Sequence, residues 1–337
     1  MAFRVGLVGT GGIARAHGNA TQQIDDAILQ AVCDVSEESV NSFGDQFKVS
    51  NRYTDLDQML KSEDLDIAII CTWGAFHEKV GVQIANSGRV KAILCEKPFT
   101  STAEEAERLV AAARKNNVLL AEAFKFRHHP MHLKAQELID SGAIGEVMNV
   151  RSTFCTGGGG GSPETRRPEQ NWRFNKAKGG GSIYDLACYN LHHARTVYKA
   201  EPVRVFASQQ AGLEVDDGAY ILLVFPNDRT AQISVGFNSW GSQYGEINGT
   251  AGGLRLDKIW NNEGQNVKLE FRSKNHSEDF DFEPTFQFAH QLQHLCDSLS
   301  TGQPHRIPPE NSINQMYVID AVYESMNTGR SVALDLS

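Results

Sequence analysis

The chain has 337 residues and a formal net charge of −9 at neutral pH, with 41% hydrophobic and 22% charged residues. This length accommodates two domains of ordinary size, and the composition is typical of a globular protein. The acidic balance argues against a nucleic acid or a membrane as partner, because nucleic acids and anionic membranes bind basic surfaces. No apolar run reaches the roughly 18–20 residues that cross a bilayer, and we expect a cytoplasmic protein.

The first third of the chain alternates short apolar runs with longer amphipathic stretches. This pattern predicts a doubly wound α/β domain with a parallel sheet, which we place at residues 1–123. A helix is expected over Ala103–Lys115, where Thr102 and Glu105 have the spacing of a capping box. The predicted strands are Arg4–Val8, Leu29–Cys33, Ile67–Cys71, Ala92–Cys95 and Val118–Ala121.

Residues 124–337 predict an α+β domain with a large, mostly antiparallel sheet. Helices are expected near Met131–Ser141, Ser182–Tyr198, Phe286–Ser300 and Glu310–Met326. Strands are expected near Val147–Phe154, Val203–Gln209, Ala219–Phe225, Ala231–Phe237 and Val267–Phe271. Between them lies a long segment without periodicity, residues 156–178, which includes five consecutive glycines, Gly157–Gly161. Such a segment is either a lid over a substrate or a plain surface loop.

The six cysteines include no C-x-x-C pair. Three of them lie in apolar, strand-like runs, where a thiol behaves as a small hydrophobic side chain. We therefore predict neither a disulfide framework nor a metal site.

A glycine motif, GTGGIA at residues 9–14, follows the first strand and opens a helix. It fits the G-x-G-x-x-A fingerprint of a dinucleotide-binding Rossmann domain. In that fingerprint Gly9 permits a tight turn, Gly11 lets the backbone approach a pyrophosphate, and Ala14 permits close packing of helix on strand. The N–H groups of the helix N-terminus then face the phosphates. We assign five of these residues to the cofactor site: Gly9, Thr10, Gly11, Gly12 and Ile13.

Asp34 ends the second predicted strand, twenty residues after Ala14. A carboxylate at this position accepts hydrogen bonds from ribose hydroxyls and repels a 2′-phosphate. Asp34 could also cap the helix that starts near Ser36, and a nearby arginine would admit NADP. NAD is therefore the predicted cofactor, with NADP as the alternative.

Glu96-Lys97-Pro98 follows the strand Ala92–Cys95. Ligands of doubly wound proteins bind beyond the carboxyl ends of the strands, so Lys97 is placed where a nicotinamide and a substrate hydroxyl could meet. Pro98 restricts the backbone directly after it. The alternative is an ordinary solvent-exposed lysine.

A second motif, Gly179–Gly181, opens the helix that carries Asp185 and Tyr189. The glycines permit a ligand to approach the helix start, and Asp185 and Tyr189 share one helix face. A phenol can donate or accept a proton if a cation such as Lys97 lowers its pKa from about 10. Alternatively, Ser182 and Asp185 form a capping box and Tyr189 is a core aromatic residue.

Together these motifs resemble those of the Gfo/Idh/MocA oxidoreductases. The resemblance runs through most of the chain and includes Glu122-Ala123-Phe124, His129-Pro130, Gly145-Glu146, Trp172-Arg173 and Tyr323-Glu324-Ser325. It implies a Rossmann domain joined to an α+β domain whose open sheet makes a homodimer or homotetramer. It also implies hydride transfer between nicotinamide C4 and a carbon of a cyclic sugar or polyol.

By this resemblance Lys97 and Tyr189 are the acid–base pair, and Asp185 supports them. Most family members have a histidine at the position of Tyr189, and the tyrosine is similar to the subgroup of glucose–fructose oxidoreductase, D-xylose dehydrogenase and dihydrodiol dehydrogenase. Those relatives tend to use NADP, whereas Asp34 favours NAD. His192 and His193 lie about one turn further along the helix, and either could share the proton chemistry.

Further residues complete the predicted site. On the cofactor side they are Thr72, Trp73, His77 and Glu96. Trp73 stands where the family usually has proline, so it is expected to reshape the nicotinamide pocket. On the substrate side they are Arg127, His128, Trp172, Arg173 and His193. Hydrogen bonding and stacking by these groups would suit a sugar ring, although Trp172 could instead be a core residue.

Two other functions are compatible with the same residues. A glycoside-cleaving enzyme that oxidises its substrate transiently with NAD would carry the same motifs. A non-catalytic cofactor-binding protein would keep the glycine fingerprint, but Lys97, Asp185 and Tyr189 together argue against it.

Overall fold

The structure is a computed structural model that describes residues 2–157 and 166–336. Most of the predicted glycine run, Gly158–Gly161, lies outside the described residues. Among the described residues, no helix combines the length and the apolar character that a membrane span requires. All six cysteine side chains are buried thiols.

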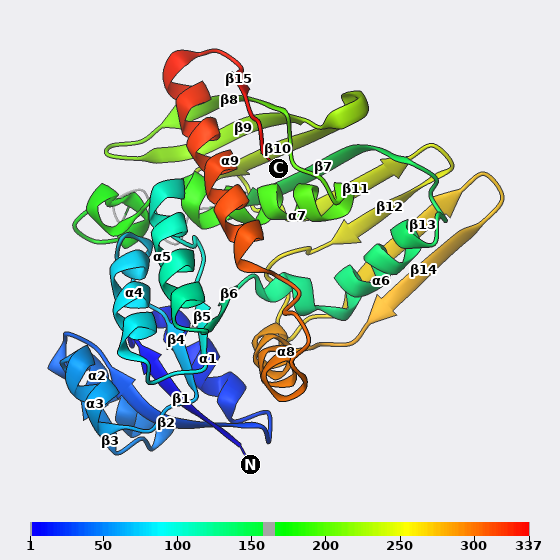
Figure 1. The fold of residues 1–337 in the computed structure, drawn as a ribbon. Coiled ribbons are helices and arrows are strands. Elements are labelled where there is room, and N and C mark those ends of the chain that lie inside the picture. The colour runs from blue at the N-terminus through cyan, green and yellow to red at the C-terminus, as the bar shows by residue number, and fades with distance from the viewer. Residues whose placement is uncertain (1, 158–165, 337) are drawn as a thin grey trace. The chain divides into compact units, whose positions relative to one another are not determined.

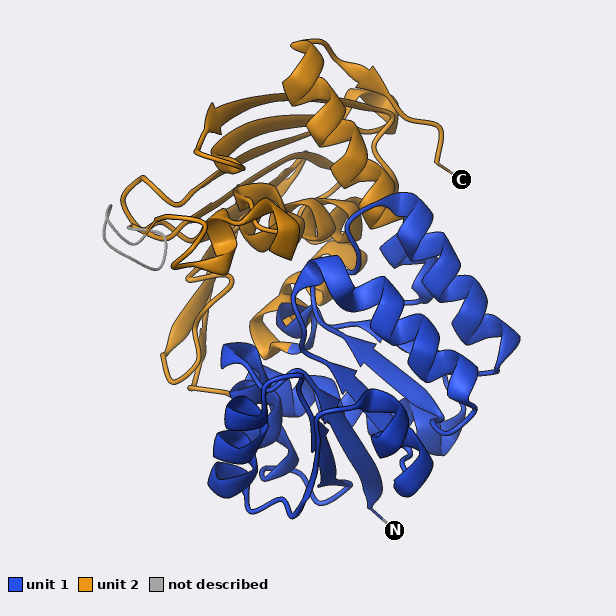
Figure 2. Ribbon diagram, turned by 90° about the vertical axis from the view of Figure 1, so that its left-hand side faces the viewer, with its two compact units in different colours: residues 1–128, 286–313 blue, residues 129–285, 314–337 orange. Residues whose placement is uncertain are grey.

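The chain divides into two units, which Figure 2 shows in different colours. Unit 1 comprises residues 1–128 and 286–313, and unit 2 comprises residues 129–285 and 314–337. The predicted division kept residues 124–337 together, whereas contacts group the helix α8 (Gln287–Thr301) with unit 1. The reason is that its apolar side, with Phe288, Leu292 and Leu295, joins the core of unit 1.

The sheet of unit 1 has six parallel strands in the order β3-β2-β1-β4-β5-β6 (Figure 1). The order reverses between β1 and β4, which is the switch point of a Rossmann fold. The predicted doubly wound sheet is therefore confirmed, and only the short β3 was not predicted. The strands are β1 (Phe3–Val8), β2 (Ala27–Cys33), β3 (Asn51–Tyr53), β4 (Ile67–Ile70), β5 (Ala92–Cys95) and β6 (Leu119–Glu122).

Helices alternate with these strands, as the pattern predicted. They are α1 (Gly12–Thr21), α2 (Glu37–Phe47), α3 (Leu56–Ser62), α4 (His77–Ser87) and α5 (Ala103–Lys115). Short 3₁₀ turns are η1 (Gly74–Phe76) and η2 (Lys125–His128). At the start of α5 the Thr102 hydroxyl accepts the N–H of Glu105 at 3.3 Å, as predicted. The Glu105 carboxylate reaches one residue further back than in a capping box, to the N–H of Ser101 at 2.9 Å.

The sheet of unit 2 has nine strands in the order β14-β13-β12-β11-β7-β10-β9-β8-β15. All neighbouring pairs are antiparallel except β7 and β10, which confirms the predicted sheet type. Four strands were not predicted, because polar residues dominate them or because they are very short: β11 (Tyr244–Gly249), β12 (Gly252–Asp257), β14 (Ser277–Phe282) and β15 (Val332–Ala333). The predicted strands are β7 (Val147–Cys155), β8 (Arg204–Ala211), β9 (Asp216–Val224), β10 (Thr230–Gly236) and β13 (Val267–Ser273).

One face of this sheet carries the helices α6 (Pro130–Asp140), α7 (Cys188–Tyr198) and the second part of α9 (Pro309–Thr328) (Figure 1). Side chains alternate along β8 accordingly, with Val205 and Ala207 buried. Ser325 of α9 accepts the N–H of Ala207 at 2.9 Å. Phe206, between these two residues, is 44% exposed on the opposite face.

Candidate active site

The turn after β1 depends on Gly9, whose φ is +90°. A Cβ atom at Gly9 would lie 2.7 Å from backbone atoms of Cys71 and Thr72, at the end of β4. Glycine is therefore required by both conformation and space. A Cβ atom at Gly11 or Gly12 would meet nothing within 4 Å in the described structure. The first N–H groups of α1, which no side chain of the described residues caps, thus have room for a pyrophosphate.

Asp34 lies directly after β2 and holds this turn. Its Oδ2 accepts the N–H of Thr10 at 2.7 Å and the Thr10 hydroxyl at 3.0 Å, and its Oδ1 accepts the N–H of Ser36 at 2.9 Å. Ser36 is the N-cap of α2, because its own hydroxyl accepts the N–H of Ser39. Asp34 therefore orders the glycine turn rather than capping the helix. Val35 beside it is 94% exposed and adds an apolar surface that no motif indicated.

A buried hydrogen bond links α1 to the segment after β5. His17 Nε2 lies 2.6 Å from Glu96 Oε1, and the two side chains are 0% and 5% exposed. Glu96 Oε2 accepts the N–H of Lys97 at 3.2 Å. Glu96 thus positions the backbone of Lys97. The predicted contact of Glu96 with the cofactor stays a prediction. His17 was missed because a single histidine within a helix carries no motif.

His77 contacts the two loops that follow β4 and β5. Its Nδ1 is 2.8 Å from the carbonyl oxygen of Pro98, which follows a cis peptide bond, and its Nε2 is 3.0 Å from that of Thr72. Burial lowers the pKa of His77, while the two backbone carbonyls act in the opposite direction. The ring thus contacts both loops. Trp73 and Phe76 are exposed nearby, with ring centroids 6.2 Å apart. They form an aromatic pair beyond the carboxyl end of β4.

In unit 2 the glycine motif allows close contact between two segments of the chain. A Cβ atom at Gly180 would lie 2.6 Å from the carbonyl oxygens of Trp172 and Arg173. Gly181 has a φ of +126°, and its Cβ atom would lie 2.7 Å from a carboxylate oxygen of Asp216. The predicted reason for these glycines, close approach of a ligand, is therefore wrong. They make room for the backbone of Trp172 and Arg173 and for Asp216.

Asp216, the first residue of β9, anchors the start of the next helix. Its Oδ2 accepts the Ser182 hydroxyl at 2.5 Å and the N–H of Ile183 at 2.8 Å, and its Oδ1 accepts the Tyr323 hydroxyl at 3.1 Å. Burial raises the pKa of Asp216, while these three donors act in the opposite direction. The N–H of Asp185 donates to the carbonyl oxygen of Gly181 at 3.0 Å and not to the Ser182 hydroxyl, so the predicted alternative of a capping box between Ser182 and Asp185 is not formed.

A π-helical turn, η6 (Ile183–Ala187), stands where a regular helix was predicted. Such turns occur frequently at functional sites. Asp185 lies in this turn, buried, and its carboxylate accepts Nε of Arg173 at 2.7 Å. The guanidinium of Arg173 lies 4.8 Å from the ring centre of Trp172, which is half-buried. Three predicted substrate-side residues thus form one cluster.

Tyr189 lies on α7 and is 6% exposed. Its ring packs edge-on against Phe154, with centroids 5.5 Å apart, and lies 5.8 Å from the ring of Trp260. His193 packs edge-on against Trp260 and His132, at 5.6 Å and 5.7 Å. This aromatic cluster holds the phenol in one orientation, which suits both a core residue and a preorganised proton donor.

The remaining predicted substrate residues, Arg127 and His128, lie in η2 of unit 1. The carbonyl of Arg127 accepts Nη1 of Arg306 at 3.0 Å. His128 is 3% exposed, and its Nε2 lies 3.2 Å from Nδ1 of His294 on α8. His128 is thus engaged within unit 1, and a contact with substrate stays a prediction for both residues.

A glycine turn that leaves a helix N-terminus open at the switch point of a Rossmann sheet is the arrangement that binds the pyrophosphate of a dinucleotide. Residues 3–124 match the model of the oxidoreductase family with an NAD-binding Rossmann fold. Residues 132–255 match the model of the GFO/IDH/MocA C-terminal domain. The chain belongs to the GFO/IDH/MocA oxidoreductase family.

Named proteins resemble the chain over almost its whole length. D-xylose 1-dehydrogenase (NADP(+)) 2 of Haloferax volcanii is 27% identical over 98% of this chain and 99% of that protein. The crystal structure of aldose-aldose oxidoreductase from Caulobacter crescentus, complexed with glycerol, has a TM-score of 0.89 at 25% identity and covers 99% of this chain and 100% of its own. A 3-ketoreductase from Actinomadura kijaniata, in complex with NADP and TDP-benzene, has a TM-score of 0.86 at 24% identity over 96% and 98% of the two chains, which shows the same fold.

Two glycine substitutions in the turn are expected to act differently. Gly11→Ala should leave the melting temperature of the apoprotein unchanged, because the added methyl group meets open space. It should weaken NAD(P)H binding by ~10-fold or more, because the methyl group stands where the pyrophosphate approaches. Gly9→Ala should lower the melting temperature by several degrees, since strain at such a position costs ~1–3 kcal/mol.

Differential scanning fluorimetry and fluorescence titration with NADH and NADPH measure the two effects. If Gly11→Ala binds both cofactors as the unmodified protein does, the pyrophosphate does not lie at this turn.

Proposed function

We propose that this protein transfers a hydride between nicotinamide C4 and a carbon of a cyclic sugar or polyol. The observation that carries this proposal is the buried carboxylate of Asp185, held by Arg173, one helical turn before Tyr189. With the ring of Trp172 beside them, these groups offer hydrogen bonds and a stacking face, which suit a polyhydroxylated ring. The names of the relatives, a D-xylose dehydrogenase and an aldose-aldose oxidoreductase, favour the same substrate class.

The chemistry divides between the cofactor and the protein. Bound NAD(P) supplies or accepts the hydride. In the direction of oxidation, the substrate hydroxyl also loses a proton, and we assign Tyr189 as its acceptor. Tyr189 must therefore start as a phenolate, which the ammonium group of Lys97 stabilises, and it becomes a neutral phenol; reduction reverses these steps. Since Lys97 belongs to unit 1 and Tyr189 to unit 2, the proposal requires both side chains to face one nicotinamide ring.

Tyr189→Phe is the sharpest test of this assignment, because it removes one hydroxyl and keeps the ring that packs against Phe154 and Trp260. We expect kcat to fall by ~10²–10⁴-fold with the cofactor dissociation constant unchanged. The assay follows cofactor absorbance with a panel of aldoses and polyols. Tyr184→Phe is the matched control, since Tyr184 lies in the same helical segment and its ring packs against Tyr323.

Lys97→Ala should also lose most turnover while the control retains it. An unchanged kcat in Tyr189→Phe would move the proton transfer to His192 or His193, and full turnover by Lys97→Ala would remove Lys97 from the mechanism. If the unmodified protein oxidises or reduces no member of the panel, the proposed substrate class is wrong.

We further propose that NAD is preferred over NADP. The Asp34 carboxylate lies beside the glycine turn, where its charge would repel a 2′-phosphate, and the residues that follow, Val35 and Ser36, carry no positive charge. Two of the relatives named above, the D-xylose 1-dehydrogenase and the 3-ketoreductase, carry NADP in their names or complexes, so this preference would separate the chain from those two.

The unmodified protein should have a higher kcat/KM with NAD than with NADP. In Asp34→Ala the ratio of kcat/KM with NAD to kcat/KM with NADP should fall by ~10-fold or more. The reason is that a hydrogen bond from a ribose hydroxyl to the charged Asp34 carboxylate contributes ~1.5–3 kcal/mol. Glu37→Gln is the control, because it removes an exposed carboxylate at the start of α2 without touching the turn. A preference for NADP in the unmodified protein, or an unchanged ratio in Asp34→Ala, contradicts the proposal.

A homodimer or homotetramer through the open face of the large sheet is proposed as well. Phe206, Tyr220 and Leu222 are 44%, 55% and 38% exposed on the neighbouring strands β8 and β9, with Phe206 and Leu222 paired in register. The solvent face of an antiparallel sheet is ordinarily polar, so such an apolar group indicates a protein partner. A second copy of the chain is the occupant that the family resemblance implies.

Light scattering after gel filtration should give at least twice the mass of one chain. Leu222→Glu should raise the dissociation constant of the assembly by ~100-fold or more, because it buries a charge in an apolar contact. Leu213→Glu makes the same exchange in the loop between β8 and β9, where Leu213 is 75% exposed, and should change nothing. A monomeric protein, or equal masses for both variants, would rule out this interface.

A further inference from the structure

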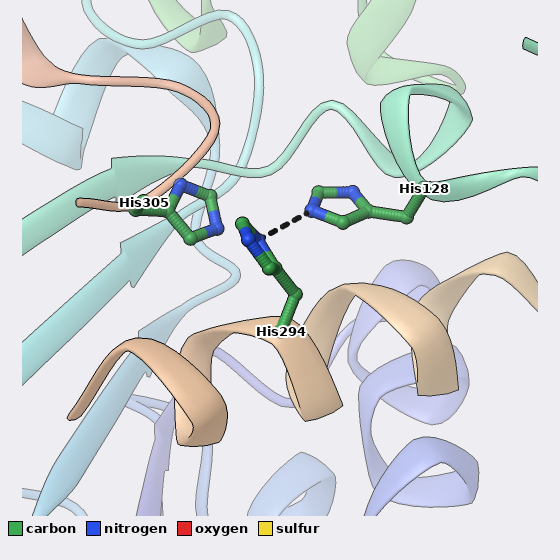
Figure 3. A group of neighbouring side chains, drawn as sticks. All are labelled: His128, His294 and His305. Carbon is green, nitrogen blue, oxygen red and sulfur yellow. Dashed lines mark hydrogen bonds between the residues drawn. The ribbon is translucent and has the colours of Figure 1, made fainter. Parts of the chain in front are cut away.

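Three histidines from distant parts of the sequence converge in unit 1 (Figure 3). His128 ends η2, His294 lies within α8, and His305 follows α8 in the loop before α9. Each ring offers one nitrogen, and the three nitrogens lie within 4.8 Å of one another. The ring centroids are 4.6–5.7 Å apart. The sequence predicted no metal site, because these histidines have no characteristic spacing.

The cluster leaves ring nitrogens without partners. Nδ1 of His128 and Nε2 of His305 are buried and have no hydrogen-bond partner among the described residues. Buried polar atoms are nearly always paired, and of these two nitrogens Nε2 of His305 is the one that indicates a missing ligand in the cluster, because His128 turns its other nitrogen, Nε2, toward His294.

His305 has a second feature of a metal ligand. Its Nδ1 lies 3.3 Å from the carbonyl oxygen of Ile307, and an N–H donated there leaves Nε2 with a bare lone pair. A backbone carbonyl orients many metal-bound histidines in this way. The N–H of Ile307 lies 3.2 Å from the same nitrogen, so the other tautomer also finds a partner. In Figure 3 the ring of His305 turns one nitrogen toward His294.

The charges around the cluster define which ions fit. Burial lowers the pKa of all three histidines, to about 3 for His305, and the guanidinium groups of Arg127 and Arg306 add to the effect. The same guanidinium charges also act against a bound cation, so the affinity has to come from the imidazole nitrogens. The carboxylate of Asp297, on α8, acts in the opposite direction and raises the pKa of His294. Imidazoles without a carboxylate favour Zn²⁺, Cu²⁺ or Ni²⁺ over Mg²⁺ and Ca²⁺.

We propose that His128, His294 and His305 bind a transition-metal ion of the zinc type. A tetrahedral ion with bonds of about 2.0–2.1 Å places its ligand nitrogens about 3.3 Å apart. Nε2 of His128 and Nδ1 of His294 already have this separation, at 3.2 Å. The third nitrogen lies within 4.8 Å of the other two, so His305 needs to move by ~1.5 Å to complete the site. The half-buried ring of His294 leaves an approach for the ion and for a fourth ligand from solvent.

Such an ion would have a structural role. It would join α8 and the following loop to η2, across 166 residues of sequence between His128 and His294. Metal binding to a folded site adds directly to folding stability. The site would hold the end of η2 where the chain passes from unit 1 into unit 2. If His128 is a metal ligand, it is no longer available for the predicted contact with substrate.

The test uses the tag-free, full-length protein after treatment with a chelator. Calorimetric titration with ZnCl₂ should show one ion bound per chain, and MgCl₂ should show none. At a hundredfold excess over the dissociation constant, Zn²⁺ should raise the melting temperature by ~5 °C. X-ray absorption of the zinc-loaded protein should show three imidazole nitrogens at about 2.0–2.1 Å.

His294→Gln should abolish zinc binding and the rise in melting temperature. His290→Gln, one turn earlier on the same helix, should retain both. The proposal is overturned if the unmodified protein does not bind Zn²⁺ or if His294→Gln binds it equally well. Should His294→Gln fail to fold, the X-ray absorption of the unmodified protein decides, because fewer than three imidazole ligands would refute the site.

Discussion

The cofactor side of this protein depends on a buried hydrogen bond between His17 and Glu96. His17 is on the helix that starts at the glycine turn, and Glu96 directly precedes Lys97, so one contact sets the open helix N-terminus relative to the lysine backbone. Without the imidazole, the carboxylate would stay buried with a partner lost, at a cost of ~1–3 kcal/mol or more. Gly9 completes the arrangement, because only a residue without a side chain fits against the end of β4.

The substrate side is built on a second buried carboxylate. Asp216 receives three hydrogen bonds and thereby fixes the start of the helix that carries Asp185 and Tyr189. The glycines before that helix let the backbone of residues 172–173 pass close by, which brings Arg173 to Asp185. In both units, then, a buried carboxylate holds the backbone from which the proposed reacting side chain extends. Preorganisation of this kind is what positions a proton donor within reach of its substrate.

Local patterns explain which features were predictable. The parallel sheet follows from unbroken apolar runs, and the turn at Gly9 follows from a motif whose strand and helix are adjacent in sequence. The supporting contacts are not local: His17 and Glu96 are 79 residues apart, and Ser182 and Asp216 are 34 apart. No periodicity or spacing connects such residues. The glycines at 180 and 181 were misinterpreted for a related reason, because a missing side chain shows that space is needed but not which atoms fill it.

The proposed reaction requires Lys97 and Tyr189 to face the same nicotinamide ring, although they belong to different units. A crystal structure of the complex with NADH and a bound sugar or polyol tests this most directly. We expect the reacting carbon about 3–3.5 Å from nicotinamide C4, with its oxygen within hydrogen-bond distance of the Tyr189 hydroxyl and with Lys97 beside it. A complex in which these two side chains point into separate regions would contradict the account.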